Sequence, residues 1–204
     1  SIKPPLIIGA ILNKGNQILN TSILWGGELP ETYVKQHLTP FGEYIPLRSL
    51  ARVVSPLVDE VEDFSPGDSG KTFQIGSIEV APVICYELID DALLEKAAQN
   101  SNILAVQTNS ATFGMSAESA QQLSITRIRA IEHGRNIASV STTGYSAIID
   151  SSGKVLQKTS MGTADSIRAS VDLIEGQTPR DRAGDWALIG VLAALFLVAR
   201  RAYI

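Results

Sequence analysis

The chain has 204 residues, of which 45% are hydrophobic and 19% charged, and its formal net charge is −4. This length and apolar content suffice to bury a sizeable core, which excludes an intrinsically disordered protein. A single cysteine excludes a disulfide scaffold, so packing must hold the fold together. The acidic balance, without any run of basic residues, argues against a nucleic-acid surface. Small molecules, lipids or proteins are therefore the expected partners.

Hydrophobic patterning predicts a mixture of strands and helices. Short, β-branched apolar segments bounded by turn residues are typical of strands, and longer segments with helical spacing are typical of helices. The expected strands are residues 6–12, 19–25, a short one from residue 32, 73–75, 78–84, 103–107, 137–141, 146–150, 155–159 and 167–171. The expected helices are 90–99 and 116–136, with a weak one within 47–61. Because helical crossovers alternate with hairpins, the order predicts an α/β sandwich of sheets and helices rather than a doubly wound fold.

Cys85 lies between an expected strand and an expected helix. The apolar run that ends at Ile84 predicts a buried strand, and Asp90 and Asp91 are acids typical of a first helical turn. A strand-to-helix junction can expose a nucleophile while backbone N–H groups point at the atom that it attacks. A lone cysteine is also often a small core residue, so position alone leaves both interpretations open.

A thiolate nucleophile needs a proton acceptor, a positive group for the developing oxyanion, and groups that hold both in place. Lys35 and Glu43 flank a loop shaped by proline and glycine, which can turn both toward one site. Glu87 follows Cys85 by two positions, close enough to influence the thiol or orient a lysine. Each of these three residues is also compatible with an ordinary solvated role.

The chain contains only two histidines, His37 and His133. A Cys–His dyad would have to use one of them, and His37 alternates with Lys35 on the same strand face. One cysteine and two distant histidines give no spacing typical of a metal site, so we expect no metal.

The end of the chain is apolar from Trp186 to Ala199 and is followed by Arg200 and Arg201. As a helix this run would cover about 21 Å, short of the roughly 30 Å hydrocarbon core, so its length alone favours a buried or re-entrant helix. Its apolar character on every face and its aromatic and arginine borders favour a membrane-spanning helix. We therefore expect a domain over residues 1–174, a linker over 175–185 and a membrane-spanning helix over 186–204.

Two motifs resemble a known superfamily. Residues 33–46, YVKQHLTPFGEYIP, resemble the lysine motif of the nitrilase (carbon-nitrogen hydrolase) superfamily, and residues 84–87, ICYE, resemble its nucleophile motif. The forms K-x-H-L-x-P-F-G-E and I-C-Y-E are similar to those of the apolipoprotein N-acyltransferase family. Further similar segments are Thr108-Asn109 with Phe113-Gly114, residues 127–135 and residues 143–146.

This resemblance implies a partial nitrilase-like α-β-β-α sandwich and an active site without a cofactor. It implies that Cys85 is the acyl-accepting nucleophile and that Lys35 stabilises the tetrahedral intermediate. The supporting acids would be Glu43 and Glu87, and the residues beside the substrate would be Tyr86 and Phe113.

The reaction that the resemblance implies has two steps. A phospholipid would donate a fatty acyl group to Cys85 as a thioester, and the α-amino group of an S-diacylglyceryl cysteine on an apolipoprotein would accept it. The family implies a bacterial cytoplasmic membrane location with the catalytic domain on the extracytoplasmic side. Arg200 and Arg201 would then face the cytoplasm, although Arg180 and Arg182 at the opposite border weaken this orientation signal.

One departure from the family pattern bears on activity. The family also has a glutamate general base well upstream of the lysine, and neither Glu28 nor Glu31, the only acids before Lys35, matches it. We therefore expect the chain to correspond to the C-terminal portion of the enzyme and to be inactive alone. Two alternatives stay open: a nitrilase-type amidase that hydrolyses a small amide, and a catalytically incomplete, membrane-tethered domain.

Overall fold

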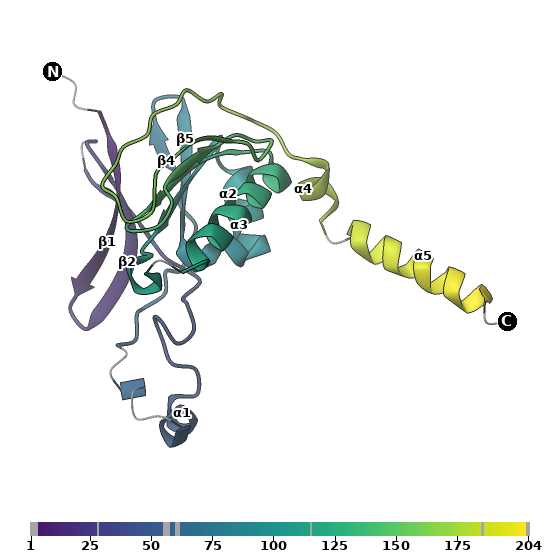
Figure 1. Cartoon of the computed structure of the whole chain (residues 1–204), viewed down its shortest axis with the longest axis horizontal. Coiled ribbons are helices and arrows are strands. Elements are labelled where there is room, and N and C mark those ends of the chain that lie inside the picture. The colour runs from purple at the N-terminus through teal and green to yellow at the C-terminus, as the bar shows by residue number, and fades with distance from the viewer. Residues whose placement is uncertain are drawn as a thin grey trace.

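A computed structural model describes residues 4–27, 29–54, 58–59, 62–114, 116–184 and 186–202, with the backbone alone for residues 54, 113, 187, 188 and 202. Within these ranges the chain forms two β-sheets and a layer of helices (Figure 1).

The smaller sheet is antiparallel and contains β1 (Leu6–Lys14), β2 (Gln17–Trp25) and β3 (Glu31–Val34) in that order. The predicted hairpin is confirmed, and both of its strands extend to the turn at Gly15, whose φ of +62° suits glycine. β3 is short and delivers the chain directly to Lys35.

The larger sheet has six strands in sequence order: β4 (Phe73–Ile75), β5 (Ile78–Ile84), β6 (Ile103–Thr108), β7 (Asn136–Ser141), β8 (Ala147–Ile149) and β9 (Val155–Lys158). β5, β6 and β7 are parallel, and the outer pairs are antiparallel. The parallel strands are connected through α2 (Asp91–Gln99) and α3 (Glu118–His133), as the sequence predicts. Parallel strands place their carboxyl ends at one edge, where sites commonly form.

The layers are stacked as sheet, sheet and helices (Figure 1). The core between the two sheets contains Leu24, Tyr33, Phe73, Val80 and Ile84. A second core lies between the six-stranded sheet and the helices and is built from residues such as Val83, Leu94, Leu104, Ala130 and Ile137. The alternation of side chains along β5 explains this division, because successive residues of a strand face opposite sides of the sheet.

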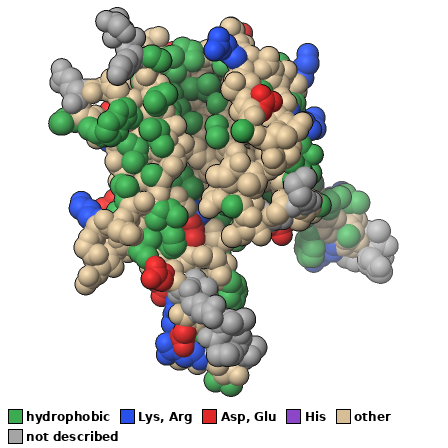
Figure 2. Space-filling view, turned by 60° about the vertical axis from the view of Figure 1, so that its left-hand side comes forward, with side chains coloured by type: hydrophobic (Ala, Val, Ile, Leu, Met, Phe, Trp, Pro, Cys, Tyr) green, Lys and Arg blue, Asp and Glu red, His purple; other side chains and the backbone are tan. Residues whose placement is uncertain are grey.

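The outer face of the three-stranded sheet carries no helix in the described part of the chain, so three layers of the expected four-layer sandwich are present (Figure 1). Hydrophobic side chains gather on this side of the molecule (Figure 2). The exposed apolar residues of β1 and β2 on this face are Leu6, Ile8, Leu12 and Trp25.

Two short helical segments bear on the site. The 3₁₀ helix η2 (Cys85–Ile89) separates β5 from α2, and η3 (Ala111–Phe113) follows β6. The weak helix expected within residues 47–61 is α1 (Arg48–Val54), at the tip of an arm that projects from the sheets (Figure 1).

The segment after β9 departs from the prediction. Residues 167–171 do not form a strand, because their backbone joins no ladder and the N–H of Arg168 bonds instead to the Gln157 side chain at 2.9 Å. Residues 175–185, expected as a linker, include α4 (Pro179–Ala183), which is held to the end of α3 by the buried pair of His133 and Asp181.

α5 (Trp186–Ala202) extends away from the sheets with exposed apolar side chains (Figure 1). Its 17 residues correspond to about 26 Å of helix, against about 30 Å for a hydrocarbon core. Of the helices in the described ranges, none has the length and apolar character to cross a membrane. The expected membrane-spanning helix is therefore not supported.

Candidate active site

Cys85 is the first residue of η2 and directly follows the last residue of β5. Its φ of +50° lies in the left-handed region, which costs a residue with a side chain about 1–3 kcal/mol. The thiol is free, and the residue lines a cavity of about 610 Å³ rather than being enclosed in either core. The expected strand-to-helix junction is therefore present, with Cys85 on the wall of a cavity.

The cavity lies where the parallel strands end. Thr108 at the end of β6 and Ser141 at the end of β7 line it together with Cys85. Much of the remaining wall is apolar, and part of it comes from the opposite sheet, because β1 contributes Ala10 and Ile11. Polar side chains such as Asn20, Glu43 and Gln107 also line it, so the cavity suits a ligand with both a hydrocarbon part and a polar part.

Lys35 follows β3 and is fully buried beside this cavity. Its ammonium donates hydrogen bonds to Glu43 Oε2 at 2.5 Å and to Thr39 Oγ1 at 3.0 Å. Thr39 and Glu43 both line the cavity that contains Cys85. Lys35, Glu43 and Cys85, selected from the sequence, are therefore brought together.

A tight turn brings Glu43 back to Lys35. The N–H of Glu43 donates to the carbonyl of Thr39 at 2.9 Å, and the N–H of Phe41 donates to the carbonyl of Tyr44 at 2.7 Å. The carboxylate also accepts the N–H of Thr39 and the side-chain amide of Asn20, both at 2.7 Å. Glu43 is thus an anchored acceptor and not a surface acid.

The charges of this cluster act on the thiol. Burial alone would raise the pKa of Glu43, but hydrogen bonds from Lys35, Thr39 and Asn20 outweigh it and hold that pKa below its ordinary value. Burial raises the pKa of the Cys85 thiol, and Glu43 raises it further, while the Lys35 ammonium and the N–H of Tyr86 lower it. The net effect is a raised pKa, so the resting thiol is protonated at neutral pH and requires a base for activation.

Glu87 lies beneath the site and does not line the cavity. Its side chain is fully buried and accepts hydrogen bonds at 2.7 Å from the N–H of Ile84, the N–H of Gln36 and the hydroxyl of Tyr33. A longer bond of 3.3 Å comes from the N–H of His37. Glu87 therefore joins the end of the nucleophile strand to the segment that carries Lys35. Burial raises its pKa despite these bonds.

Neither of the two expected substrate residues is placed on the cavity by the structure. Tyr86 makes an edge-to-face contact with the His37 ring, with centroids 5.4 Å apart, and it is not part of the cavity wall. The backbone of Phe113 ends η3, but its side chain lies outside the described part of the structure.

The histidines do not form a dyad with Cys85. Nδ1 of His37 lies 2.7 Å from Asp90 Oδ2, and Nδ1 of His133 lies 2.8 Å from Asp181 Oδ1 at the far end of α3. Neither ring lines the Cys85 cavity. In the described part of the chain, no group of three or more His, Cys, Asp or Glu side chains is placed to hold a metal ion.

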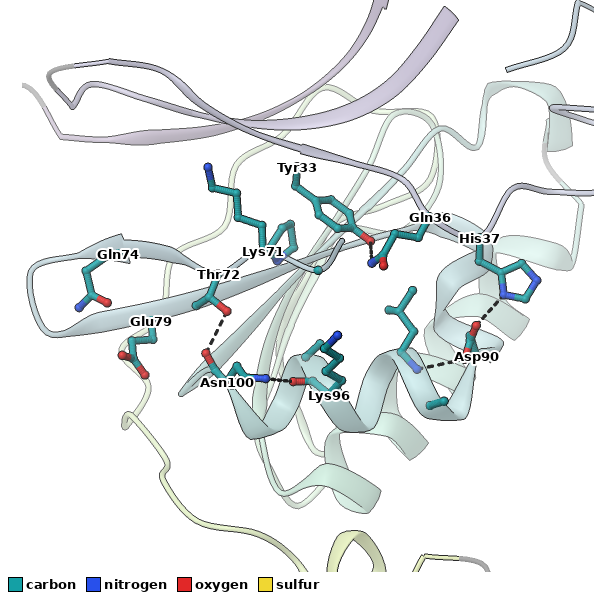
Figure 3. Close-up of a pocket in the computed structure, with 15 residues that line it drawn as sticks. Tyr33, Gln36, His37, Lys71, Thr72, Gln74, Glu79, Asp90, Lys96 and Asn100 are labelled. Atoms are coloured by element: carbon teal, nitrogen blue, oxygen red, sulfur yellow. Dashed lines mark hydrogen bonds and ion pairs between the residues drawn. The ribbon is translucent and has the colours of Figure 1, made fainter. Parts of the chain in front are cut away.

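A second cavity of about 910 Å³ lies beside α2 and does not include Cys85 or Lys35 (Figure 3). Tyr33 and Gln36 form one side, and Lys96 of α2 and Asn100, which follows this helix, form the other. Its polar side chains are largely engaged with one another, as in the bond between Thr72 Oγ1 and the carbonyl of Asn100 at 2.9 Å. Of these two cavities, Cys85 therefore lines the smaller one and not the larger.

Sequence reasoning missed Asn20 and Thr39 as members of the site. Thr39 lies inside the lysine motif, but nothing in the sequence distinguishes its side chain as a ligand of Lys35. Asn20 could be found only through strand register: Thr21 pairs with Val34, which places Asn20 opposite Lys35. That register depends on the hairpin being aligned correctly.

Comparison with known proteins gives consistent results. A family model described as carbon-nitrogen hydrolase matches residues 2–181. A curated relative from Pseudomonas paraeruginosa named apolipoprotein N-acyltransferase is 32% identical over 190 residues, covering 92% of this chain and 37% of that protein. A protein of the same name from Nitrosomonas europaea is 34% identical over 182 residues, covering 87% of this chain and 37% of that protein. The chain thus spans little more than a third of the length of these relatives.

Solved structures share the fold. A CN-hydrolase superfamily protein from Xanthomonas campestris superposes with a TM-score of 0.56 at 16% identity, covering 76% of this chain and 58% of that one. An amidase from Nesterenkonia sp. AN1 superposes with a TM-score of 0.58 at 18% identity, covering 77% and 59%. In that amidase structure, acrylamide has added to the active-site cysteine.

Proposed function

The chain belongs to the carbon-nitrogen hydrolase family, and from this premise we propose that it forms part of an apolipoprotein N-acyltransferase in which Cys85 carries the acyl group. The names of its curated relatives support an acyltransferase. The donor would be a membrane phospholipid and the acceptor the α-amino group of an S-diacylglyceryl cysteine on an apolipoprotein.

One observation carries this proposal: Glu43, which lines the same cavity as Cys85, accepts a hydrogen bond at 2.5 Å from the buried Lys35 ammonium. In the first half-reaction the Cys85 thiolate attacks the ester carbonyl of the phospholipid. The carbonyl oxygen becomes an oxyanion, which the Lys35 ammonium stabilises. The C–O bond then breaks, and the lysophospholipid leaves as an alcohol with the proton that the thiol gave up.

The second half-reaction returns the thiol. The acceptor's amine nitrogen attacks the thioester carbonyl, the C–S bond breaks, and the amide forms as the sulfur regains a proton. Glu43 would keep the ammonium oriented through both steps, and Glu87 would fix the distance between the two catalytic segments. Tyr86 and Phe113 remain proposed neighbours of the substrate.

The proton acceptor for Cys85 is proposed to come from beyond this sequence. Glu43 is engaged by Lys35, Thr39 and Asn20, and Glu87 by four donors. A carboxylate occupied in this way is a poor general base. We therefore propose that the isolated chain forms no thioester at a useful rate.

The membrane association of this activity is also a proposal. α5 exposes Leu192, Leu197 and Val198, which lie on three different sides of the helix, and it ends in Arg200 and Arg201. Such a helix suits contact with lipid, and arginines at its end can reach anionic headgroups. By the family resemblance the catalytic domain would lie on the extracytoplasmic side of the bacterial cytoplasmic membrane.

A chimera tests the proposal. The matched portion of the Pseudomonas paraeruginosa relative is replaced by this chain, and the protein is incubated with phospholipid vesicles. We expect a hydroxylamine-sensitive fatty acyl mass on Cys85, and its loss as amide product when a diacylglyceryl peptide is added. The Cys85→Ala chimera should show neither, and the isolated chain should show no acyl mass.

Two outcomes would contradict the proposal. One is peptide acylation by the Cys85→Ala chimera. The other is a chimera whose Cys85 reacts readily with iodoacetamide, and whose fold is thus intact at the site, but which gains no acyl group.

A further inference from the structure

We infer that Asn20 is a positioning residue of the Cys85 site: its side-chain amide fixes the Glu43 carboxylate, and through it the direction of the Lys35 ammonium. This inference rests on the proposed function for its catalytic consequence. Its physical content, the orientation of a carboxylate and an ammonium beside a thiol, can be measured without any lipid substrate.

Asn20 contacts both members of the charged pair. Its Nδ2 donates to Glu43 Oε1 at 2.7 Å, and its backbone carbonyl accepts the N–H of Lys35 at 2.8 Å. Because Thr21 pairs with Val34, the side chains of Asn20 and Lys35 leave the sheet on the same face. Asn20 also lines the Cys85 cavity.

The two oxygens of Glu43 are held differently. Oε2 accepts from the Lys35 ammonium and from the N–H of Thr39. Oε1 accepts from Asn20, which is its one donor within the described part of the chain. Without that bond, rotation of the carboxylate about its Cγ–Cδ bond is less restricted. The Lys35 ammonium, which is bonded to Oε2, would change direction together with that oxygen.

The mechanical setting makes Asn20 suited to this role. Glu43 lies on the turn at the base of the projecting arm, whereas Asn20 lies in the middle of the nine-residue strand β2, which is paired on both sides. A group on a rigid strand holds a reactive side chain more accurately than a group on a loop. Asn20 therefore holds the Glu43 side chain, which lies on a turn, in a fixed position relative to the sheet.

The chemistry of the side chain matters as much as its place. An amide N–H is a neutral donor, so it satisfies the carboxylate without competing with Lys35 for charge. A carboxylate at position 20 would lack the donor and repel Glu43 Oε1. The additional negative charge beside the cavity would disfavour the thiolate of Cys85.

The test is the pH dependence of Cys85 alkylation by iodoacetamide in the full chain. For Asn20→Asp we expect the midpoint of the profile to move upward by about one pH unit. For Asn20→Ala we expect a smaller movement. Asn16→Asp, in the exposed turn of the same hairpin, introduces the same charge farther from the site and should leave the profile unchanged.

The outcomes separate this inference from the proposed function. Superimposable profiles for wild type, Asn20→Asp and Asn20→Ala, with thermal unfolding intact, would overturn the positioning role whether or not the protein transfers acyl groups. If Asn20→Asp fails to fold, Asn20→Ala, which lacks the donor, must still shift the profile. Failure of the chimera to acylate would count against the proposed function alone.

Discussion

The carboxylate of Glu87 accepts the backbone N–H of Gln36 at 2.7 Å, although the two residues are 51 positions apart. The same carboxylate accepts the N–H of Ile84, immediately before the nucleophile. The buried Glu87 side chain therefore connects two backbone segments, the one that follows Lys35 and the one that precedes Cys85. The distance between ammonium and thiol depends on this connection.

Replacing Glu87 with Gln should destabilise the fold. A glutamine supplies one acceptor oxygen where the carboxylate supplies two, and its NH₂ group would face backbone donors. Leaving a buried donor unsatisfied costs about 1–3 kcal/mol in free energy of unfolding, which urea titration would measure. Glu79→Gln, an exposed acid on β5, should stay within about 0.5 kcal/mol. Equal stabilities for both variants would refute the connecting role of Glu87.

Alkylation of Cys85 should be slow at neutral pH and accelerate with pH, because burial raises the pKa of the thiol. Lys35→Met should move the midpoint of the profile upward, since the ammonium is the strongest influence lowering that pKa. Lys14→Met, at the exposed end of β1, is the matched control and should behave as wild type. A midpoint unchanged in Lys35→Met would mean that the ammonium does not act on the sulfur.

Lowering the pH should reveal the contribution of ionised Glu43 to the free energy of unfolding. Its pKa is lowered in the folded state, so the ionised carboxylate contributes stability above the unfolded value of 4.5, and this contribution is lost as the pH falls through the folded value. Urea titrations at several pH values from about 6 down to about 3 should show that the free energy of unfolding of the wild type decreases as the pH falls. The decrease should be less steep for Glu43→Gln. The exposed Glu118→Gln should keep the wild-type slope. Parallel slopes in all three proteins would contradict the lowered pKa.

Gly67 provides a steric test of the segment that carries Lys35. Its N–H donates to the carbonyl of Lys35 at 2.8 Å, and a Cβ there would lie 2.3 Å from the carbonyl oxygen of Val34. Gly67→Ala should therefore lower the free energy of unfolding by about 1–3 kcal/mol and disturb the Cys85 alkylation profile.

Gly70→Ala is the control for this steric effect. Its Cβ would meet nothing closer than Gln36 Nε2 at 3.9 Å, so both stability and alkylation should be retained. If Gly67→Ala were as stable as Gly70→Ala, the contact between Gly67 and β3 would be looser than the structure has it.

The local pattern of apolar and turn residues was sufficient to predict most strands and helices, but it wrongly predicted a strand over residues 167–171. The hairpin ending at Trp25 and the strand ending at Ile84 were predicted because apolar and β-branched residues alternate with turn signals around them. Residues 167–171 also contain apolar residues, but their backbone pairs with no strand in the described part of the chain. Strand formation requires a partner, and the sequence of one segment does not specify whether a partner is available.

The sequence by itself identified Cys85 as the candidate nucleophile, the junction that carries it and the two motifs, because these depend on residue identity and short spacing. Only the tertiary structure decided that Glu87 is a buried connector, that Asn20 supports Glu43, and that neither histidine reaches Cys85. These are contacts between segments distant along the chain. They follow from sheet register and packing, which fix side chains in three dimensions to an accuracy that spacing along the chain cannot supply.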